Sequence, residues 1–172
     1  MVMGHRPLDP DALGDHVDRL YRAAWALCGR REDAEDLVQD TYARVLAKPR
    51  LLRSEDDFAY LLRALRNTHV SRVRAAARRP AERPFVDRDT ADPRKAADPA
   101  VVLVARELFA VIAALPAAQR DVIVAVDVAG LSYREAGRAL RVKEATVTTR
   151  LHRARRAVVA QLREPILERA GA

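Results

Sequence analysis

Residues 131–140 read LSYREAGRAL, residues 141–143 read RVK, and residues 144–162 read EATVTTRLHRARRAVVAQL. Ser132 and Glu135 have the spacing of a capping box, in which each side chain accepts a hydrogen bond from the other residue's backbone amide. A short capped helix, a three-residue turn and a longer basic helix are the outline of a helix-turn-helix. The C-terminal part of the chain is therefore expected to carry a helix-turn-helix unit.

The last predicted helix has an apolar face and a polar face. At ~100° per residue, Val147, Leu151, Ala154 and Val158 fall on one side, so that side is expected to face the core. The opposite side and its flanks carry Ala145, Thr146, Thr148, Thr149, Arg150, His152, Arg153 and Arg156. Hydroxyl groups and arginines can reach base edges and phosphates in a major groove. A surface helix with no DNA role is the open alternative.

The composition points to a basic helical protein. The 172 residues include 31 Lys+Arg and 24 Asp+Glu, which gives a formal net charge of +7, and 49% are hydrophobic. Most of the excess lies in residues 105–172, which hold 12 basic and 7 acidic side chains. Such a field suits a surface that meets phosphates, and a solvated helix face is the alternative. Only 5% of residues are aromatic, which disfavours a β-sandwich or barrel.

The single cysteine and the absence of a long apolar segment suggest the environment of the chain. Cys28 is the only cysteine, so neither an intrachain disulfide nor a cysteine-rich zinc site is expected, and its place on an apolar helix face favours the core. No apolar stretch approaches the ~20 residues that span a bilayer. We expect a cytoplasmic protein without membrane insertion.

Two groups of predicted helices are separated by a segment without periodicity. Apolar residues recur at helical spacing over residues 13–28, 32–47, 54–77, 100–115, 117–129 and 144–162. Residues 78–99 lose this pattern, and their four prolines interrupt any helix. A loop of this length inside one compact domain would be unusual. The sequence predicts an all-α fold of two small helical domains, residues 1–77 and 100–172, joined by a flexible linker at residues 78–99.

Two segments resemble, in the right order, the two characteristic domains of bacterial RNA polymerase sigma factors of the extracytoplasmic-function (ECF) type of the sigma-70 family. Leu20-Tyr21, DAEDLVQDT at residues 33–41 and residues 58–74 resemble region 2. Residues 115–120, GLSY at 130–133 and residues 146–156 resemble region 4. The resemblance implies a specificity subunit with no catalytic residue, cofactor or metal ion, so the chain is not expected to be an enzyme.

The resemblance implies that the acidic helix docks on the clamp helices of the polymerase's largest subunit. The positions carried over are Asp36, Gln39 and Asp40, which lie opposite the apolar stripe of their helix. A solvated acidic face is one alternative. Another class is a metal-dependent hydrolase with Asp33, Asp36 and Asp40 as ligands, although no histidine or further carboxylate cluster completes such a shell.

The helix predicted over residues 54–77 would then be the promoter-melting element. Asn67 matches a family position that contacts an unpaired base of the minus-10 element, and Tyr60 stands where an aromatic residue often occurs. Nearby arginines, Arg72 among them, would hold the backbone. The predicted minus-10 contacts are Tyr60, Arg63, Arg66, Asn67, Ser71 and Arg74. Backbone hydrogen bonding for Asn67 and core packing for Tyr60 are the alternatives.

The helix-turn-helix would read the minus-35 element as duplex DNA. The predicted contacts are Ser132, Tyr133, Thr146, Thr148, Thr149, His152, Arg153 and Arg156. The chain departs from the family at several positions: Ser71 replaces a common acid or amide, Val126 an arginine, Arg141 the usual turn glycine, and Lys143 a frequent proline. Arg141 is expected to strain the turn if the turn needs a positive φ.

The partners that the resemblance implies are promoter DNA and core RNA polymerase, through its clamp helices and its flap. Because many relatives are held inactive by an anti-sigma protein, such a protein is a further candidate partner. The main alternative is a stand-alone helix-turn-helix regulator that acts as a dimer on two-fold symmetric half-sites.

Overall fold

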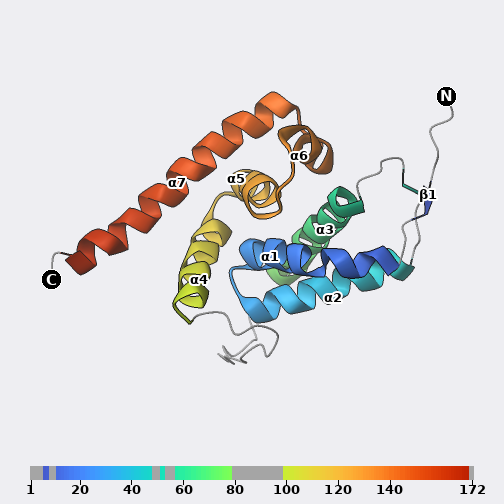
Figure 1. Ribbon diagram of the computed structural model, residues 1–172, viewed down its shortest axis with the longest axis horizontal. Helices are drawn as coiled ribbons and strands as arrows, with labels where there is room; N and C mark the ends of the chain where they lie inside the picture. Colours follow the sequence, from blue (N-terminus) through green and yellow to red (C-terminus); the bar gives the residue numbers. More distant parts are fainter. Residues whose placement is uncertain (1–5, 8–10, 48–50, 53–56, 79–98, 171–172) are drawn as a thin grey trace.

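The computed structural model describes residues 6–7, 11–47, 51–52, 57–78 and 99–170, which are almost entirely helical (Figure 1). The N-terminal helices are the 3-10 helix η1 (Asp11–His16), α1 (Val17–Cys28), α2 (Arg31–Ala47) and α3 (Asp57–Arg78). The C-terminal helices are α4 (Pro99–Ala114), α5 (Ala117–Ile123), the π-helical turn η2 (Val124–Val128), α6 (Tyr133–Leu140) and α7 (Glu144–Ala170). The all-α prediction is confirmed.

One small feature was not predicted. The two-residue strands β1 (Arg6–Pro7) and β2 (Leu51–Leu52) pair antiparallel, with Arg6 opposite Leu52. The expected linker falls largely on residues 79–98, which lie outside the described residues. The division of the chain into two domains at that segment therefore stays a prediction.

The N-terminal helices pack because each presents one apolar face to the other two. Leu20 of α1, Leu37 of α2, and Leu61 and Leu65 of α3 are completely buried. Thr41 is buried beside them, and its Oγ1 donates to the backbone oxygen of Leu37 at 2.7 Å, so the hydroxyl is satisfied inside the core. This packing leaves the polar side of α2 facing outward.

The helix-turn-helix forms from α6 and α7 as predicted. The capping box is confirmed: the Glu135 amide donates to Ser132 Oγ at 3.3 Å, and the Ser132 amide donates to Glu135 Oε2 at 2.8 Å. Gly137 permits the tight turn, because a Cβ at this position would lie 2.9 Å from the backbone oxygen of Val142. The predicted apolar stripe of α7 is buried, namely Val147, Leu151, Ala154 and Val158.

The turn between α6 and α7 carries the strain that its sequence predicted. Arg141 caps α6 with φ 57° and ψ 45°, in the left-handed region, and it is the only non-glycine residue with positive φ within the described part of the chain. A side chain in this conformation brings Cβ too close to the following carbonyl oxygen. The family's usual glycine would not meet that contact.

Replacing Arg141 with glycine is expected to raise the free energy of unfolding by about 0.5–1 kcal/mol, because the relief of left-handed strain exceeds the added entropy of the unfolded chain. Thermal and urea unfolding would measure the change. Arg134→Gly in α6 is the matched control: its residue is helical, so the same substitution is expected to lower stability by up to about 1 kcal/mol. Equal destabilisation by both variants would contradict the strain.

The N-terminal and C-terminal helices lie against one another. α1 packs beside α4 and η2, and α3 packs against α6 (Figure 1). The rings of Trp25 in α1 and Phe109 in α4 meet edge to face, with centroids 4.9 Å apart. Buried apolar residues from both groups of helices form one continuous cluster, so the two segments share an interface.

Candidate functional site

The first turns of α7 present a polar face to solvent over their buried apolar stripe. Thr148, Thr149, His152, Arg153 and Arg156 are exposed, and Thr146 is half-buried. The Oγ1 atoms of Thr148 and Thr149 donate to the backbone oxygens of Glu144 at 3.2 Å and Ala145 at 3.0 Å. Their hydroxyl protons are thus used within the helix, while their oxygens can still accept from a base or a backbone group.

The two predicted contacts at the start of α6 have intrachain roles. Ser132 is exposed, but its Oγ also donates to Glu135 Oε2 at 2.6 Å, so its hydroxyl belongs to the cap. Hydrogen bonds from the Ser132 side chain and amide lower the pKa of the Glu135 carboxyl. Tyr133 is half-buried at the first position of the helix.

An ion pair that no sequence pattern indicated ties α7 to η2. Arg155 donates from Nε and Nη2 to the two carboxylate oxygens of Asp127, at 2.9 Å and 2.7 Å. This bidentate geometry is the favourable one for an arginine and a carboxylate, and the bonds raise the pKa of Arg155 above its usual value. The pair braces α7 just after the residues of its exposed face.

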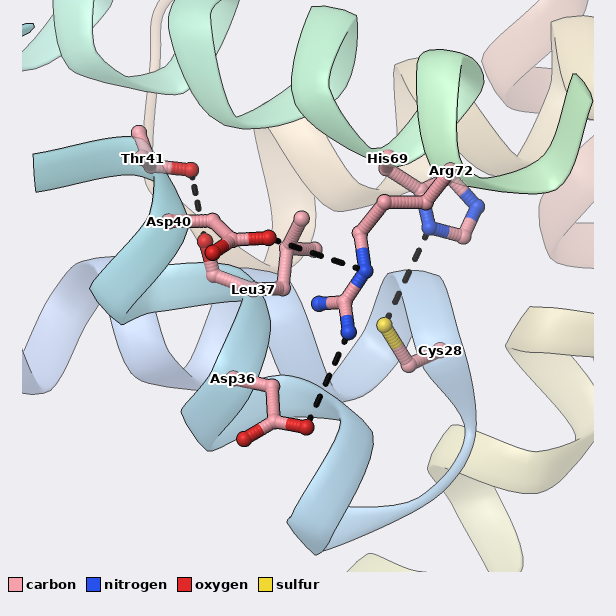
Figure 2. A network of polar contacts seen from close by, with 7 residues as sticks. All are labelled: Cys28, Asp36, Leu37, Asp40, Thr41, His69 and Arg72. Carbon is pink, nitrogen blue, oxygen red and sulfur yellow. Dashed lines mark hydrogen bonds and ion pairs between the residues drawn. The ribbon is translucent and has the colours of Figure 1, made fainter. Parts of the chain in front are cut away.

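The acidic face of α2 points outward as predicted. Asp36, Gln39 and Asp40 are exposed, on the side opposite the buried Leu37. Arg72 of α3 reaches across to this face: its Nη2 lies 3.7 Å from Asp36 Oδ2 and its Nε lies 3.9 Å from Asp40 Oδ2 (Figure 2). Exposed pairs at such distances contribute little stability, so they leave both carboxylates available to a partner.

Behind Arg72, Cys28 and His69 lie next to each other (Figure 2). The Cys28 Sγ is 3.8 Å from His69 Nδ1, and burial raises the pKa of the thiol to about 11. Burial also lowers the pKa of His69. A thiol that stays protonated at neutral pH is a poor nucleophile, which supports the core role expected for Cys28.

No three His, Cys, Asp or Glu side chains gather into a metal-binding group within the described part of the chain. The three aspartates of the hydrolase alternative therefore have no geometric support as a ligand set.

The predicted minus-10 residues of α3 fall into two groups. Asn67, Ser71 and Arg74 are exposed, and their spacing of four and three residues puts them on one helix face. Arg63 and Arg66 are half-buried and bonded to the C-terminal helices, and Tyr60 is half-buried. The structure thus brings three predicted residues together on a free face and engages two others inside the chain.

Arg63 and Arg66 hold partners that sequence reasoning missed. Arg63 donates from Nε to the backbone oxygen of Ala139 at 3.2 Å and from Nη2 to that of Arg138 at 2.7 Å. Arg66 donates from Nε to Asp121 Oδ2 at 2.6 Å. These partners are 55 to 76 residues away in the chain, and no local spacing announces them.

An apolar groove lies among α4, η2 and α7. Its walls include Leu108, Phe109, Ile112, Ile123 and Val158, with Arg22, Asp127 and Arg155 among its lining residues. Separately, no helix in the described residues combines the length and the apolar character that crossing a membrane requires.

Models of two protein families match the chain. Sigma-70 region 2 matches residues 13–79, and Sigma-70, region 4 matches residues 105–158. The chain is 35% identical over 157 residues to "ECF RNA polymerase sigma factor SigE" of Mycolicibacterium smegmatis, covering 84% of this chain. It spans 58% of that relative's length.

Solved structures share the fold. The sigma factor RpoE in complex with the anti-sigma factor NepR from Bartonella quintana has a TM-score of 0.66 at 24% identity, over 90% of this chain and 98% of that one. CnrH in complex with the cytosolic domain of CnrY has a TM-score of 0.64 at 23% identity, over 90% of this chain and 86% of that one. With region 2 and region 4 matched in order, the chain belongs to the sigma-70 family of RNA polymerase sigma factors, in its extracytoplasmic-function group.

Proposed function

We propose that this chain acts as an alternative sigma factor that binds core RNA polymerase, recognises the minus-35 and minus-10 promoter elements and promotes DNA opening for initiation. The carrying observation is the ordered pair of family segments, residues 13–79 and 105–158. Catalysis belongs to the polymerase, so the chain itself needs no catalytic residue. Because RNA polymerase works in the cytoplasm, that compartment is the one proposed for this chain.

The acidic face of α2 is the proposed contact with the polymerase clamp helices. Asp36, Gln39 and Asp40 are exposed on a helix whose other side is locked into the core, which supports a rigid docking surface. The apolar groove beside Phe109 and Ile112 is the proposed seat of the polymerase flap. Apolar lining with charged residues at its margin suits a partner helix with one apolar face.

The promoter contacts are assigned to two faces. The exposed side of α7, with Thr148, Thr149, His152, Arg153 and Arg156, is proposed to read the minus-35 element. On α3, the free face of Asn67, Ser71 and Arg74 is proposed to meet the minus-10 element. Residues 1–77 and 100–172 would then act as two domains on the linker at 78–99, which makes two weak contacts avid when their spacing fits the promoter.

An anti-sigma protein is a further proposed partner. Two solved structures of the same fold hold such partners or a partner domain, NepR in one and the cytosolic domain of CnrY in the other.

The deciding experiment measures binding of the full chain to core RNA polymerase that lacks any sigma factor, by co-elution and fluorescence anisotropy. The triple variant Asp36→Ala/Gln39→Ala/Asp40→Ala is expected to bind about tenfold more weakly, a loss of about 1.4 kcal/mol. Asp15→Ala/Glu107→Ala is the matched control, since it removes the same two negative charges from exposed sites elsewhere. If the folded wild-type chain ignores the polymerase and binds symmetric duplex DNA as a dimer, the stand-alone regulator is correct instead.

A further inference from the structure

The interface between the N-terminal and C-terminal helices uses side chains that the proposed DNA contacts also need. Arg63 and Arg66 are successive arginines on one side of α3, three residues apart. Both point to the C-terminal helices in this structure, and both belong to the proposed minus-10 set. Their present partners therefore compete with DNA for the same guanidinium groups.

Arg63 closes the end of α6. The last carbonyl groups of a helix lack partners within the helix and carry the negative end of its dipole. Arg63 donates to two of them, the backbone oxygens of Arg138 at 2.7 Å and Ala139 at 3.2 Å. The arginine thus binds the first helix of the helix-turn-helix unit through its C-terminal end.

Arg66 forms the ion pair at the centre of the contact. Its Nε lies 2.6 Å from Asp121 Oδ2, and the Asp121 side chain is only 8% exposed while that of Arg66 is 34% exposed. A nearly buried carboxylate needs a bonded partner, so losing Arg66 would leave its charge uncompensated. A guanidinium held this way is not free for a phosphate.

Apolar contacts extend the interface along α1. Besides the Trp25 and Phe109 rings, the backbone at Gly29 comes so near α4 that a Cβ there would lie 2.9 Å from the Cβ of Ala113. Trp25 is 7% exposed, and its buried Nε1 has no hydrogen-bond partner within the described residues. An unpaired buried donor is a cost, so the contact is close but not optimal.

We propose that Arg63, Arg66 and Asp121 form a latch that holds the helix-turn-helix unit against α3 and withholds two arginines from DNA until the chain opens. The latch rests on the proposed function, because it matters only if α3 meets promoter DNA. Any ligand that needs the freed arginines or the separated domains favours the open form, and the closed form weakens that ligand's binding to the same degree.

The test uses the full chain with three substitutions. Asp121→Asn removes the carboxylate that holds Arg66 and changes none of the proposed DNA contacts. Ala113→Leu adds bulk where α4 meets Gly29 and leaves the net charge unchanged. Asp127→Asn is the matched control, since it removes the same charge from an ion pair within the C-terminal helices. Circular dichroism checks that each variant keeps its helices.

Two readouts follow opening without polymerase. Trp25 is the only tryptophan, so acrylamide quenching of its fluorescence reports the interface. Fluorescence anisotropy with a short fluorescein-labelled single-stranded oligonucleotide reports the freed arginines. Asp121→Asn and Ala113→Leu are expected to quench more strongly than wild type and to bind the oligonucleotide about threefold to tenfold more tightly. Asp127→Asn is expected to match wild type in quenching.

Quenching that stays at the wild-type level in both opening variants overturns the latch. So does stronger quenching with an oligonucleotide affinity no greater than that of Asp127→Asn. If Asp121→Asn loses helicity, Ala113→Leu decides, since it leaves the ion pair chemistry intact. Failure of the proposed function appears separately, as absence of binding to core polymerase, while Trp25 quenching still tests whether the interface opens.

Discussion

Replacing Phe58 with alanine is expected to lower the free energy of unfolding by about 3–5 kcal/mol. The Phe58 side chain is 1% exposed in the first turn of α3. The Arg19 guanidinium lies 3.8 Å from its ring centroid, and the His16 ring centroid is 5.6 Å away. Truncation leaves a cavity and also removes a cation–π contact. Urea unfolding followed by circular dichroism would measure the loss.

Val73→Ala is the control for Phe58→Ala on the same helix. Val73 is 54% exposed, so its truncation is expected to change stability by no more than about 0.5 kcal/mol. A similar small effect for both substitutions would mean that the start of α3 is not anchored in the core. The proposed minus-10 face depends on that anchor, because Asn67, Ser71 and Arg74 lie further along the same helix.

Replacing Arg153 with alanine is expected to weaken promoter binding by the reconstituted holoenzyme by about tenfold to 100-fold. An arginine that forks onto a guanine contributes about 1–3 kcal/mol of discrimination. Arg153 is exposed on the same side of α7 as Thr149 and His152, and the buried Leu151 and Ala154 hold it in place. The measurement compares duplexes with the native and a scrambled minus-35 element.

Arg106→Ala is the matched control for Arg153→Ala. Arg106 is exposed on α4, so its removal lowers the net charge equally without touching α7. Discrimination between the two duplexes is expected to fall only for Arg153→Ala. If both variants lose affinity equally and keep full discrimination, Arg153 contributes only general charge and the reading face lies elsewhere.

The contacts seen here give the predicted site residues unequal standing. Arg153 and Asn67 are exposed, so partners can reach them without rearrangement. Arg63 and Arg66 are bonded to the helix-turn-helix unit, and the Ser132 hydroxyl is used in its cap. Mutations at the engaged residues therefore alter stability or domain contact as well as any DNA contact, and their effects need the structural controls described above.

The features that could be read from the sequence are those whose cause lies within a few residues. The capping box of Ser132 and Glu135 spans three positions, and the buried stripe of α7 follows from the 3.6-residue period of a helix. The outward acidic face of α2 follows from the same period. The strain at Arg141 was also predictable, because a turn of this shape favours glycine.

The remaining features depend on how distant helices pack. Arg66 meets Asp121, Arg63 meets the end of α6, and Arg155 meets Asp127, at separations of 55, 75–76 and 28 residues. Such pairs have no fixed spacing, since each exists only once apolar surfaces such as Trp25 and Phe109 have brought their helices together. Local periodicity and capping therefore define the helices and their faces. Only the tertiary packing decides which arginines stay free for DNA, because a guanidinium can satisfy either a buried carboxylate or a phosphate, but not both at once.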